Sequence, residues 1–153
     1  MRPEDPTRRA ALLGLVVLPA CVGAEDAPGG APDQGSDAAI CGPAPAPGTE
    51  ALTLALADYP ALREPGGAVV VERPDLLLNV VVVHTPEGCF RALWRICPHG
   101  ACPVAYRPDD RDLRCPCHGS RFGENGALLM GPAERGLRAF PVTRAGETLT
   151  LYR

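Results

Sequence analysis

The stretch at residues 97–120, CPHGACPVAYRPDDRDLRCPCHGS, holds four cysteines and two histidines. These side chains gather in two short segments, CPHGAC at 97–102 and CPCHGS at 115–120. Thiolates and imidazoles are the groups with which proteins bind zinc, haem iron and iron–sulfur clusters. The stretch therefore predicts either a metal centre or a set of disulfide bonds.

The spacing pairs one thiolate with one imidazole in each segment. Cys97 and His99 come first, and after fifteen further residues Cys115 and His118 follow. A structural zinc site accepts cysteine and histidine at comparable spacings. A covalent c-type haem does not fit, because it needs Cys-x-x-Cys-His and the second segment is one residue short.

Two further cysteines, Cys102 and Cys117, are left over, one in each segment. They are placed so that a disulfide could join the segments. Zinc gives no reason for this extra pair, and a simple disulfide knot gives no reason for the two histidines. Both alternatives stay open on the residues alone, although neither accounts for all six side chains.

Short apolar runs separated by Gly, Pro and Asp begin at residue 51, and this pattern is typical of strands and turns. Apolar and polar side chains alternate in several of the runs, as in a sheet with one buried face. The runs occupy residues 51–59, 66–72, 76–85, 89–94, 112–115, 126–130, 137–142 and 147–153. We predict an antiparallel all-β domain over residues 51–153, without a helix, in which His84 is an edge side chain and not a ligand.

The first 20 residues resemble an export signal. Arg8 and Arg9 precede the apolar run 10–20, as in twin-arginine signals, and two chance arginines before an ordinary secretory signal are the alternative. The run is much shorter than the roughly 20 residues that a membrane-spanning helix needs. The sequence LPAC at 18–21 also resembles a lipoprotein box, which predicts a lipid on Cys21. Simple cleavage near Ala24 is the alternative.

Residues 21–50 are predicted to form a flexible tether. Ala, Gly and Pro dominate residues 22–48, which carry four acids and no base. Such a composition cannot bury enough apolar surface to form a core. A tether lets a domain move between partners, but a plain spacer has the same composition. Cys41, in this segment, can form a second disulfide with Cys89, and two free thiols are the alternative.

The overall charge excludes one class of partner. All 15 basic residues are Arg, the formal net charge is −3, and no basic run stands out in the sequence. Nucleic-acid-binding domains usually carry a basic patch or stripe. We therefore predict no nucleic-acid partner.

The two segments are followed by RF at 121–122 and later by GPA at 131–133. In this order they closely resemble the Rieske iron–sulfur proteins of the disulfide-containing class, as in cytochrome bc-type complexes and arsenite oxidase small subunits. The resemblance covers residues 51–153. It implies an antiparallel Rieske fold with a small cluster-binding subdomain, and one [2Fe-2S] cluster as cofactor.

The resemblance also implies a role for each ligand. Cys97 and Cys115 would hold one iron, and His99 and His118 would hold the other. Two ferric ions, two sulfides and two thiolates sum to zero charge, so one added electron leaves the core at only −1. The reduction potential is therefore expected in the Rieske window of about −150 to +300 mV.

By the same resemblance Cys102 pairs with Cys117 in a disulfide. Such a bond persists in an oxidising compartment, which agrees with export. Dioxygenase-type ferredoxins share the ligand spacing but work in the cytoplasm without this pair, which argues against that role. No nucleophile or acid–base pair is visible, so we expect a redox carrier and not an enzyme with its own substrate.

Further residues are assigned by the resemblance to the surroundings of the cluster. Ser120 matches the family serine whose hydroxyl binds a bridging sulfide. Phe122 stands where high-potential members have Tyr, so a lower potential is expected. Gly131 and Pro132 match the proline loop that covers the cluster. Gly100 stands where the high-potential pattern has Leu, which argues against quinol oxidation.

The predicted function is one-electron transfer on the periplasmic side of the membrane, to which a lipid on Cys21 attaches the protein. Its partners would be a redox donor and a redox acceptor. Two alternatives stay open. One is the Rieske subunit of a quinol-oxidising cytochrome bc-type complex, and the other is the small subunit of a periplasmic molybdenum oxidoreductase such as arsenite oxidase.

Overall fold

Strands dominate the part of the chain that the computed structural model describes, residues 45–46 and 48–153. These residues belong to one compact unit. The predicted export signal, Cys21 and Cys41 lie outside the described residues and stay predictions. In the described part, no helix has the length and apolar character that crossing a membrane requires.

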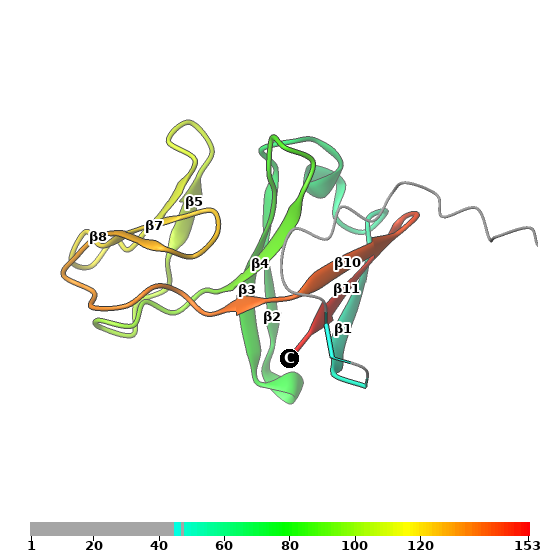
Figure 1. Cartoon of the computed structure of the whole chain (residues 1–153), viewed down its shortest axis with the longest axis horizontal. Coiled ribbons are helices and arrows are strands. Elements are labelled where there is room, and N and C mark those ends of the chain that lie inside the picture. Colours follow the sequence, from blue (N-terminus) through cyan, green and yellow to red (C-terminus); the bar gives the residue numbers. More distant parts are fainter. Residues whose placement is uncertain (1–44, 47) are drawn as a thin grey trace, which may run out of the picture. The chain divides into compact units, whose positions relative to one another are not determined.

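Two antiparallel sheets, which we call the base, form one part of the domain (Figure 1). The three-stranded sheet has the order β1–β11–β10, and the four-stranded sheet has the order β2–β3–β4–β9. Their strands are β1 (Glu50–Ala55), β2 (Ala68–Arg73), β3 (Leu78–His84), β4 (Phe90–Trp94), β9 (Ala139–Phe140), β10 (Val142–Ala145) and β11 (Thr148–Tyr152). The antiparallel all-β prediction is confirmed.

A third antiparallel sheet forms a small subdomain between β4 and β9 of the chain (Figure 1). Its order is β5–β6–β7–β8. The strands are short: β5 (Ala105–Arg107), β6 (Asp112–Arg114), β7 (Arg121–Gly123) and β8 (Leu128–Met130). Both cysteine–histidine segments lie in this insertion, so the predicted small cluster-binding subdomain is confirmed.

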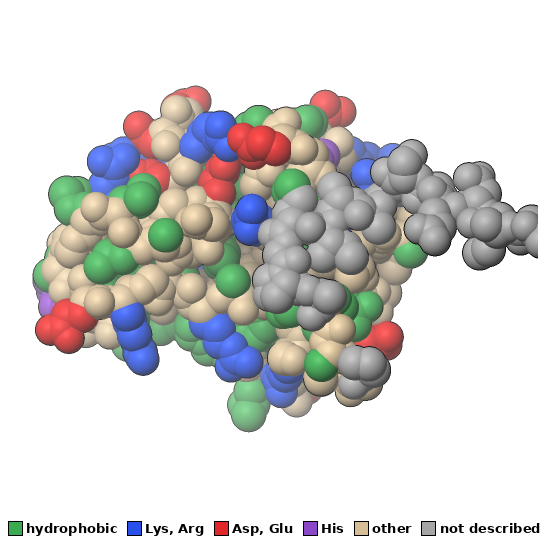
Figure 2. Space-filling view, in the orientation of Figure 1, with side chains coloured by type: hydrophobic (Ala, Val, Ile, Leu, Met, Phe, Trp, Pro, Cys, Tyr) green, Lys and Arg blue, Asp and Glu red, His purple; other side chains and the backbone are tan. Residues whose placement is uncertain are grey.

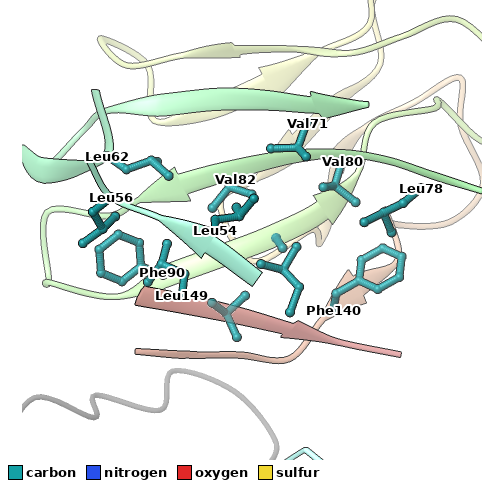
Figure 3. Close-up of a cluster of buried hydrophobic side chains, with 13 residues drawn as sticks. Leu54, Leu56, Leu62, Val71, Leu78, Val80, Val82, Phe90, Phe140 and Leu149 are labelled. Atoms are coloured by element: carbon teal, nitrogen blue, oxygen red, sulfur yellow. The ribbon is translucent and has the colours of Figure 1, made fainter. Parts of the chain in front are cut away.

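The core of the base lies between its two sheets (Figure 3). Val80 and Val82 of β3 contribute to it together with Leu54 of β1 and Leu149 of β11, and each of these side chains is at most 3% exposed. Burying one such side chain stabilises a fold by about 1.5–3 kcal/mol relative to leaving it exposed. This core holds β1 and β11 against the four-stranded sheet.

A second core joins the base to the inserted subdomain. Val81 and Val83 of β3 belong to it, together with Leu113 of β6 and Phe122 of β7, and all four are at most 2% exposed. Because successive side chains of a strand point to opposite faces, β3 is buried on both sides. This explains the continuous run of four valines, which does not alternate as a strand with one wet face would.

Two short 3-10 helices differ from the sequence prediction. They are η1 (Pro60–Arg63) and η2 (Pro74–Leu76), and each begins with a Pro, whose fixed φ suits the first helical turn. The run predicted at 76–85 therefore becomes a strand only at Leu78. Leu77, between helix and strand, has a positive φ of 48°.

The prediction that His84 is an edge side chain is wrong. His84 ends β3, which pairs with a strand on each side, and only 7% of the residue is exposed. Its ring stacks on Phe90, the residue opposite it in β4, with ring centroids 4.3 Å apart. A side chain on an inner strand has neighbours on both sides and little contact with solvent. The His84 ring is therefore packed against Phe90 and is not exposed to water.

Candidate metal centre

The first loop, residues 97–102, follows β4 and is closed by its own backbone. The Cys97 N–H donates to the Cys102 carbonyl at 2.8 Å, and the Ala101 N–H donates to the Cys97 carbonyl at 3.0 Å. An isolated bridge between Ile96 and Pro103 holds the two ends of the loop together. Backbone hydrogen bonds therefore determine where the Cys97 side chain lies.

The second loop, residues 115–120, repeats this pattern between β6 and β7. The Cys115 N–H donates to the Ser120 carbonyl at 2.9 Å, and the Gly119 N–H donates to the Cys115 carbonyl at 3.0 Å. Gly119 has a φ of 78°, and Ala101 at the same place in the first loop has a φ of 56°. Cys97 and Cys115 thus occupy equivalent positions in two similar loops.

Ala101 is the strained residue of the first loop, because a positive φ costs an L-residue about 1 kcal/mol that glycine avoids. We expect Ala101→Gly to raise the free energy of unfolding by about 0.5 kcal/mol, since the greater freedom of glycine in the unfolded chain cancels part of the gain. Urea unfolding followed by circular dichroism measures the change. The matched variant Gly119→Ala should lower the same free energy by about 0.5 kcal/mol for the same two reasons, and shifts of the same sign in both variants would contradict this account.

The two loop cysteines are buried thiols. Cys97 is 1% exposed and Cys115 is 2% exposed, and neither is in a disulfide. Burial raises the pKa of the Cys97 thiol, but hydrogen bonds with the backbone of His99 and Gly100 and with the side chains of Cys115 and Ser120 outweigh it. The pKa of Cys97 therefore lies below its usual value. Since the thiolate is the form that binds a metal, the lowered pKa favours metal binding by this buried sulfur.

The two histidines lie side by side at the surface. His99 and His118 are both exposed, with ring centroids 4.8 Å apart and ring planes at 84°. A Cβ on Gly100 would lie 3.4 Å from both Cε1 and Nδ1 of His118, so a larger side chain at this position would contact that ring. The four predicted ligands thus form a buried sulfur pair and an exposed imidazole pair, each with one member from each loop.

The predicted disulfide between Cys102 and Cys117 is confirmed, with Cα atoms 6.4 Å apart. The sulfurs of Cys102, Cys117 and Cys115 lie within 4.8 Å of one another. This group cannot supply three thiolates to a metal, because the sulfurs of Cys102 and Cys117 are bonded to each other. The short distances show instead that the disulfide lies next to the buried thiol of Cys115. Cys89 is not a free thiol, but Cys41 lies outside the described residues, so a bridge between them stays a prediction.

Ser120 connects the second loop to the segment that was expected to cover the site. Its hydroxyl oxygen accepts a hydrogen bond from the Ala133 N–H at 2.9 Å, and both residues are buried. The same hydroxyl is one of the groups that lower the pKa of the Cys97 thiol. Gly131 and Pro132, which precede Ala133, are exposed. Within residues 131–133, Ala133 makes the contact with Ser120. Gly131 and Pro132, which the resemblance assigned to the covering loop, form the solvent-exposed part of this segment.

The sequence profile of the Rieske [2Fe-2S] domain matches residues 54–141, which include both loops and the whole inserted sheet. The chain belongs to the Rieske [2Fe-2S] domain family. A Rieske domain binds one [2Fe-2S] cluster, so this protein is an electron-transfer protein. Its donor set fits that cluster, because a buried sulfur pair and an exposed imidazole pair are the two kinds of ligand that a Rieske centre takes.

Relatives of this Rieske protein include iron-sulfur subunits of cytochrome b6-f complexes. It is 30% identical over 99 residues to the cytochrome b6-f complex iron-sulfur subunit 1 of Synechocystis sp., covering 65% of this chain and 46% of the relative. It is 35% identical over 54 residues to the cytochrome b6-f complex iron-sulfur subunit of Synechococcus sp., covering 35% of this chain and 31% of the relative. The chain thus spans less than half the length of these relatives.

Solved structures agree with this assignment. The plasma membrane Rieske protein PetC3 from Synechocystis PCC 6803 superposes with a TM-score of 0.53 at 25% identity, covering 68% of this chain and 98% of that one. The ferredoxin of carbazole 1,9a-dioxygenase from Nocardioides aromaticivorans has a TM-score of 0.53 at 20% identity, with coverages of 68% and 97%. The second likeness concerns the fold alone. The predicted Rieske fold is therefore confirmed.

Phe122 lies inside the core that also contains the two Rieske loop cysteines. It is fully buried, and in β7 it stands opposite Leu113 of β6. Cys97 and Cys115 belong to the same buried cluster. The ring therefore supplies an apolar wall to the sulfur pair and offers it no hydrogen-bond donor.

A buried carboxylate, which the sequence did not single out, braces the second Rieske loop. Asp112 is 1% exposed and accepts from the Nε of Arg121 at 2.6 Å and of Arg114 at 3.3 Å. Arg114 ends β6 and Arg121 begins β7, so these two residues directly flank the loop. The sequence does show an Asp and an Arg before the second loop and another Arg after it. That these three charges meet can be recognised only once β6 and β7 are known to pair.

Proposed function

We propose that Cys97 and Cys115 bind one iron of the [2Fe-2S] cluster and that His99 and His118 bind the other. The two buried free thiols, the adjacent exposed rings and the disulfide between the loops support this assignment. When bound, the cluster accepts and releases one electron. The single observation that carries the proposal is that each loop contributes one buried sulfur and one exposed imidazole.

The difference in burial gives the site a direction. The cysteine side chains are covered by protein, and the histidine side chains reach the surface, so a partner comes closest to the site at His99 and His118. We therefore assign these two imidazoles as the port through which electrons enter and leave. The protein would carry single electrons between a redox donor and a redox acceptor.

Two more specific roles remain as proposals beside the carrier. The names of the relatives favour a Rieske subunit of a quinol-oxidising cytochrome complex. Gly100, where the high-potential pattern has Leu, favours a carrier or the small subunit of a periplasmic molybdenum oxidoreductase. We favour the carrier, exported and held at the membrane by a lipid on Cys21, because a Gly at this position leaves the His118 ring without an apolar shield.

The deciding experiment is redox titration of the purified full-length chain followed by EPR. We expect one [2Fe-2S] cluster per chain with a reduction potential between about −150 and +300 mV. Metal analysis of the same sample is the control. Stoichiometric zinc without iron, in a host that assembles iron–sulfur clusters, would overturn the proposal.

Phe122→Tyr is expected to raise the reduction potential by about 40 mV. The added hydroxyl would lie in the core that holds the sulfur pair, and a hydrogen bond to sulfur stabilises the more negative reduced state by about 1 kcal/mol. For a one-electron couple 59 mV corresponds to about 1.4 kcal/mol. Redox titration measures the shift. Phe122→Leu, which adds no donor, is the control and should not raise the potential; an unchanged potential in the tyrosine variant contradicts the expectation.

Attachment through Cys21 is tested by labelling and fractionation. The full-length chain should incorporate labelled fatty acid and appear in the membrane fraction, whereas Cys21→Ser should lose at least about nine-tenths of the label, because a thioether-linked lipid needs the thiol. Cys41→Ser is the matched control and should keep the label. Equal labelling of wild type and Cys21→Ser would exclude this anchor.

A further inference from the structure

A groove of about 980 Å³ runs beside the first loop. His99 and Gly100 line one part of it, residues 135–138 line another, and Phe140 of β9 and Leu77 lie farther along. Leu77 is 80% exposed. The groove therefore connects one of the proposed port histidines with the base of the domain.

The floor of the groove is apolar and ordered by packing. Trp94 of β4 and Phe140 of β9 both line it, with ring centroids 6.2 Å apart. Trp94 is the only tryptophan of the chain. A partly buried aromatic floor of this kind is common at the centre of protein contacts.

Three arginines surround this floor, namely Arg135, Arg138 and Arg153, and all three are exposed. No Asp or Glu is among the lining residues. The Arg138 guanidinium stacks over Phe140 at 4.8 Å, and the Arg153 guanidinium donates to the Leu76 carbonyl. Two of the three positive charges are therefore held in place at the groove. Figure 2 shows basic side chains along the lower edge of the face in view.

The pairing of charges distinguishes these arginines from most others. Each of the following forms an ion pair with a carboxylate: Arg63, Arg73, Arg95, Arg111, Arg114, Arg121 and Arg144. Within residues 48–153, Arg135, Arg138 and Arg153 form none. On a chain of net charge −3, the groove beside the port is thus lined by three arginines that form no ion pair within the described residues.

We propose that this groove docks an acidic surface of the redox partner and so places the partner beside His99. The inference rests on the proposed electron-transfer function and adds the chemistry of the partner. Carboxylates around the electron-exchange edge of the partner would meet Arg135, Arg138 and Arg153, and an apolar side chain would meet Trp94. Unpaired charge of one sign steers an oppositely charged protein and accelerates association.

The kinetic test uses the reduced full-length protein and hexacyanoferrate(III), an anion that stands for the acidic surface. One electron leaves the protein, and the probe becomes hexacyanoferrate(II). At low ionic strength, Arg135→Gln/Arg138→Gln/Arg153→Gln should lower the second-order rate constant about tenfold in stopped-flow measurements. With cationic tris(phenanthroline)cobalt(III) as oxidant, the same variant should react faster than wild type.

The matched control changes net charge equally at sites away from the groove. At an ionic strength of about 0.1 M, where the Debye length is about 10 Å, Arg63→Gln/Arg73→Gln/Arg107→Gln should change either rate constant less than about twofold and less than the groove variant does, because these side chains do not line the groove. Equal effects of the two triple variants would overturn the proposal, since only net charge would then matter.

Binding is measured separately from electron transfer. Octaglutamate should shift the single indole N–H signal of Trp94 in NMR spectra, and the groove variant should lose this shift while the control variant keeps it. A protein without the [2Fe-2S] EPR signal would defeat the proposed function. A protein with that signal in which octaglutamate leaves Trp94 unaffected would defeat the docking proposal alone.

Two other occupants would also overturn the proposal, and each has its own outcome. The first of these occupants is the acidic segment at residues 22–48, whose four acids are neutralised in Glu25→Gln/Asp26→Asn/Asp33→Asn/Asp37→Asn. Octaglutamate binding that appears only in this variant would assign the groove to residues 22–48. Dimers in sedimentation that dissociate in the groove variant would assign it to a second copy of the chain.

Discussion

Replacing both Cys102 and Cys117 with serine should lower the free energy of unfolding by about 3 kcal/mol. The disulfide closes a loop with a sequence separation of 15, and a loop of this size restricts the unfolded chain by about that amount. Both residues lie in the cluster-binding loops, so the loss falls on the segment that holds the proposed ligands. Urea unfolding of the wild-type and double-variant chains measures the difference.

Retention of the cluster provides a second measurement for the same variant. The bridge joins the two loops, each of which supplies one thiol and one imidazole, and without it they are held together only by packing and by the ligands themselves. Visible absorption should therefore decay about tenfold faster in the variant when a chelator is present, which corresponds to about 1.4 kcal/mol of the lost stability. Reduction of the wild-type disulfide should reproduce this behaviour. A loss of stability below about 1 kcal/mol would show that packing alone holds the loops.

Ser120→Ala should lower both stability and reduction potential. Removing the hydroxyl leaves the Ala133 N–H, buried at this contact, without its 2.9 Å acceptor, which costs about 1–3 kcal/mol. The Ser120 hydroxyl also lowers the pKa of the Cys97 thiol and so favours negative charge on that sulfur. Without it the more negative reduced state should lose about 1 kcal/mol, and the potential should fall by about 40 mV. Urea unfolding and redox titration measure the two effects.

Thr143→Ala is the matched control for Ser120→Ala. The Thr143 hydroxyl is 3.1 Å from the Tyr152 hydroxyl in the base, and both residues are partly buried. Its loss should cost about 1 kcal/mol of stability and leave the potential unchanged. A potential that stays constant in Ser120→Ala would mean that the serine only fastens the Ala133 segment. A potential that falls equally in both variants would mean that general destabilisation, and not the sulfur contact, moves it.

The chemistry of the centre was predictable because it resides in short segments. A six-residue loop such as 97–102 is closed by hydrogen bonds between its own residues, so the spacing of Cys97 and His99 already limits where the two side chains can lie. The second loop repeats this geometry independently. The disulfide, by contrast, was predicted from resemblance, since no local rule says which cysteine meets Cys102.

The strands were harder to predict where the two parts of the domain meet. The run from Val80 to Val83 indicated a strand but not that both of its faces are buried, because the second face is covered by an insertion that starts after β4. His84 was misplaced for a different reason: it shares the face of Val80 and Val82, and its burial there depends on Phe90 of the neighbouring strand, which strand pairing alone brings beside it. The short strands β5 and β7 have no apolar pattern of their own and exist because β6 and β8 pair with them.

By itself, the sequence determined the kind of centre and the all-β class, because ligand identity, ligand spacing and strand-length apolar runs are local properties of the chain. Only the tertiary structure decided which side chains are exposed at that centre, which residues support it and which arginines are left without an ion pair. Asp112 is buried between two arginines of different strands, and Arg135, Arg138 and Arg153 meet at one groove although Arg153 lies far along the chain. Burial and electrostatic pairing depend on distances in space, and these are set only when the sheets pack.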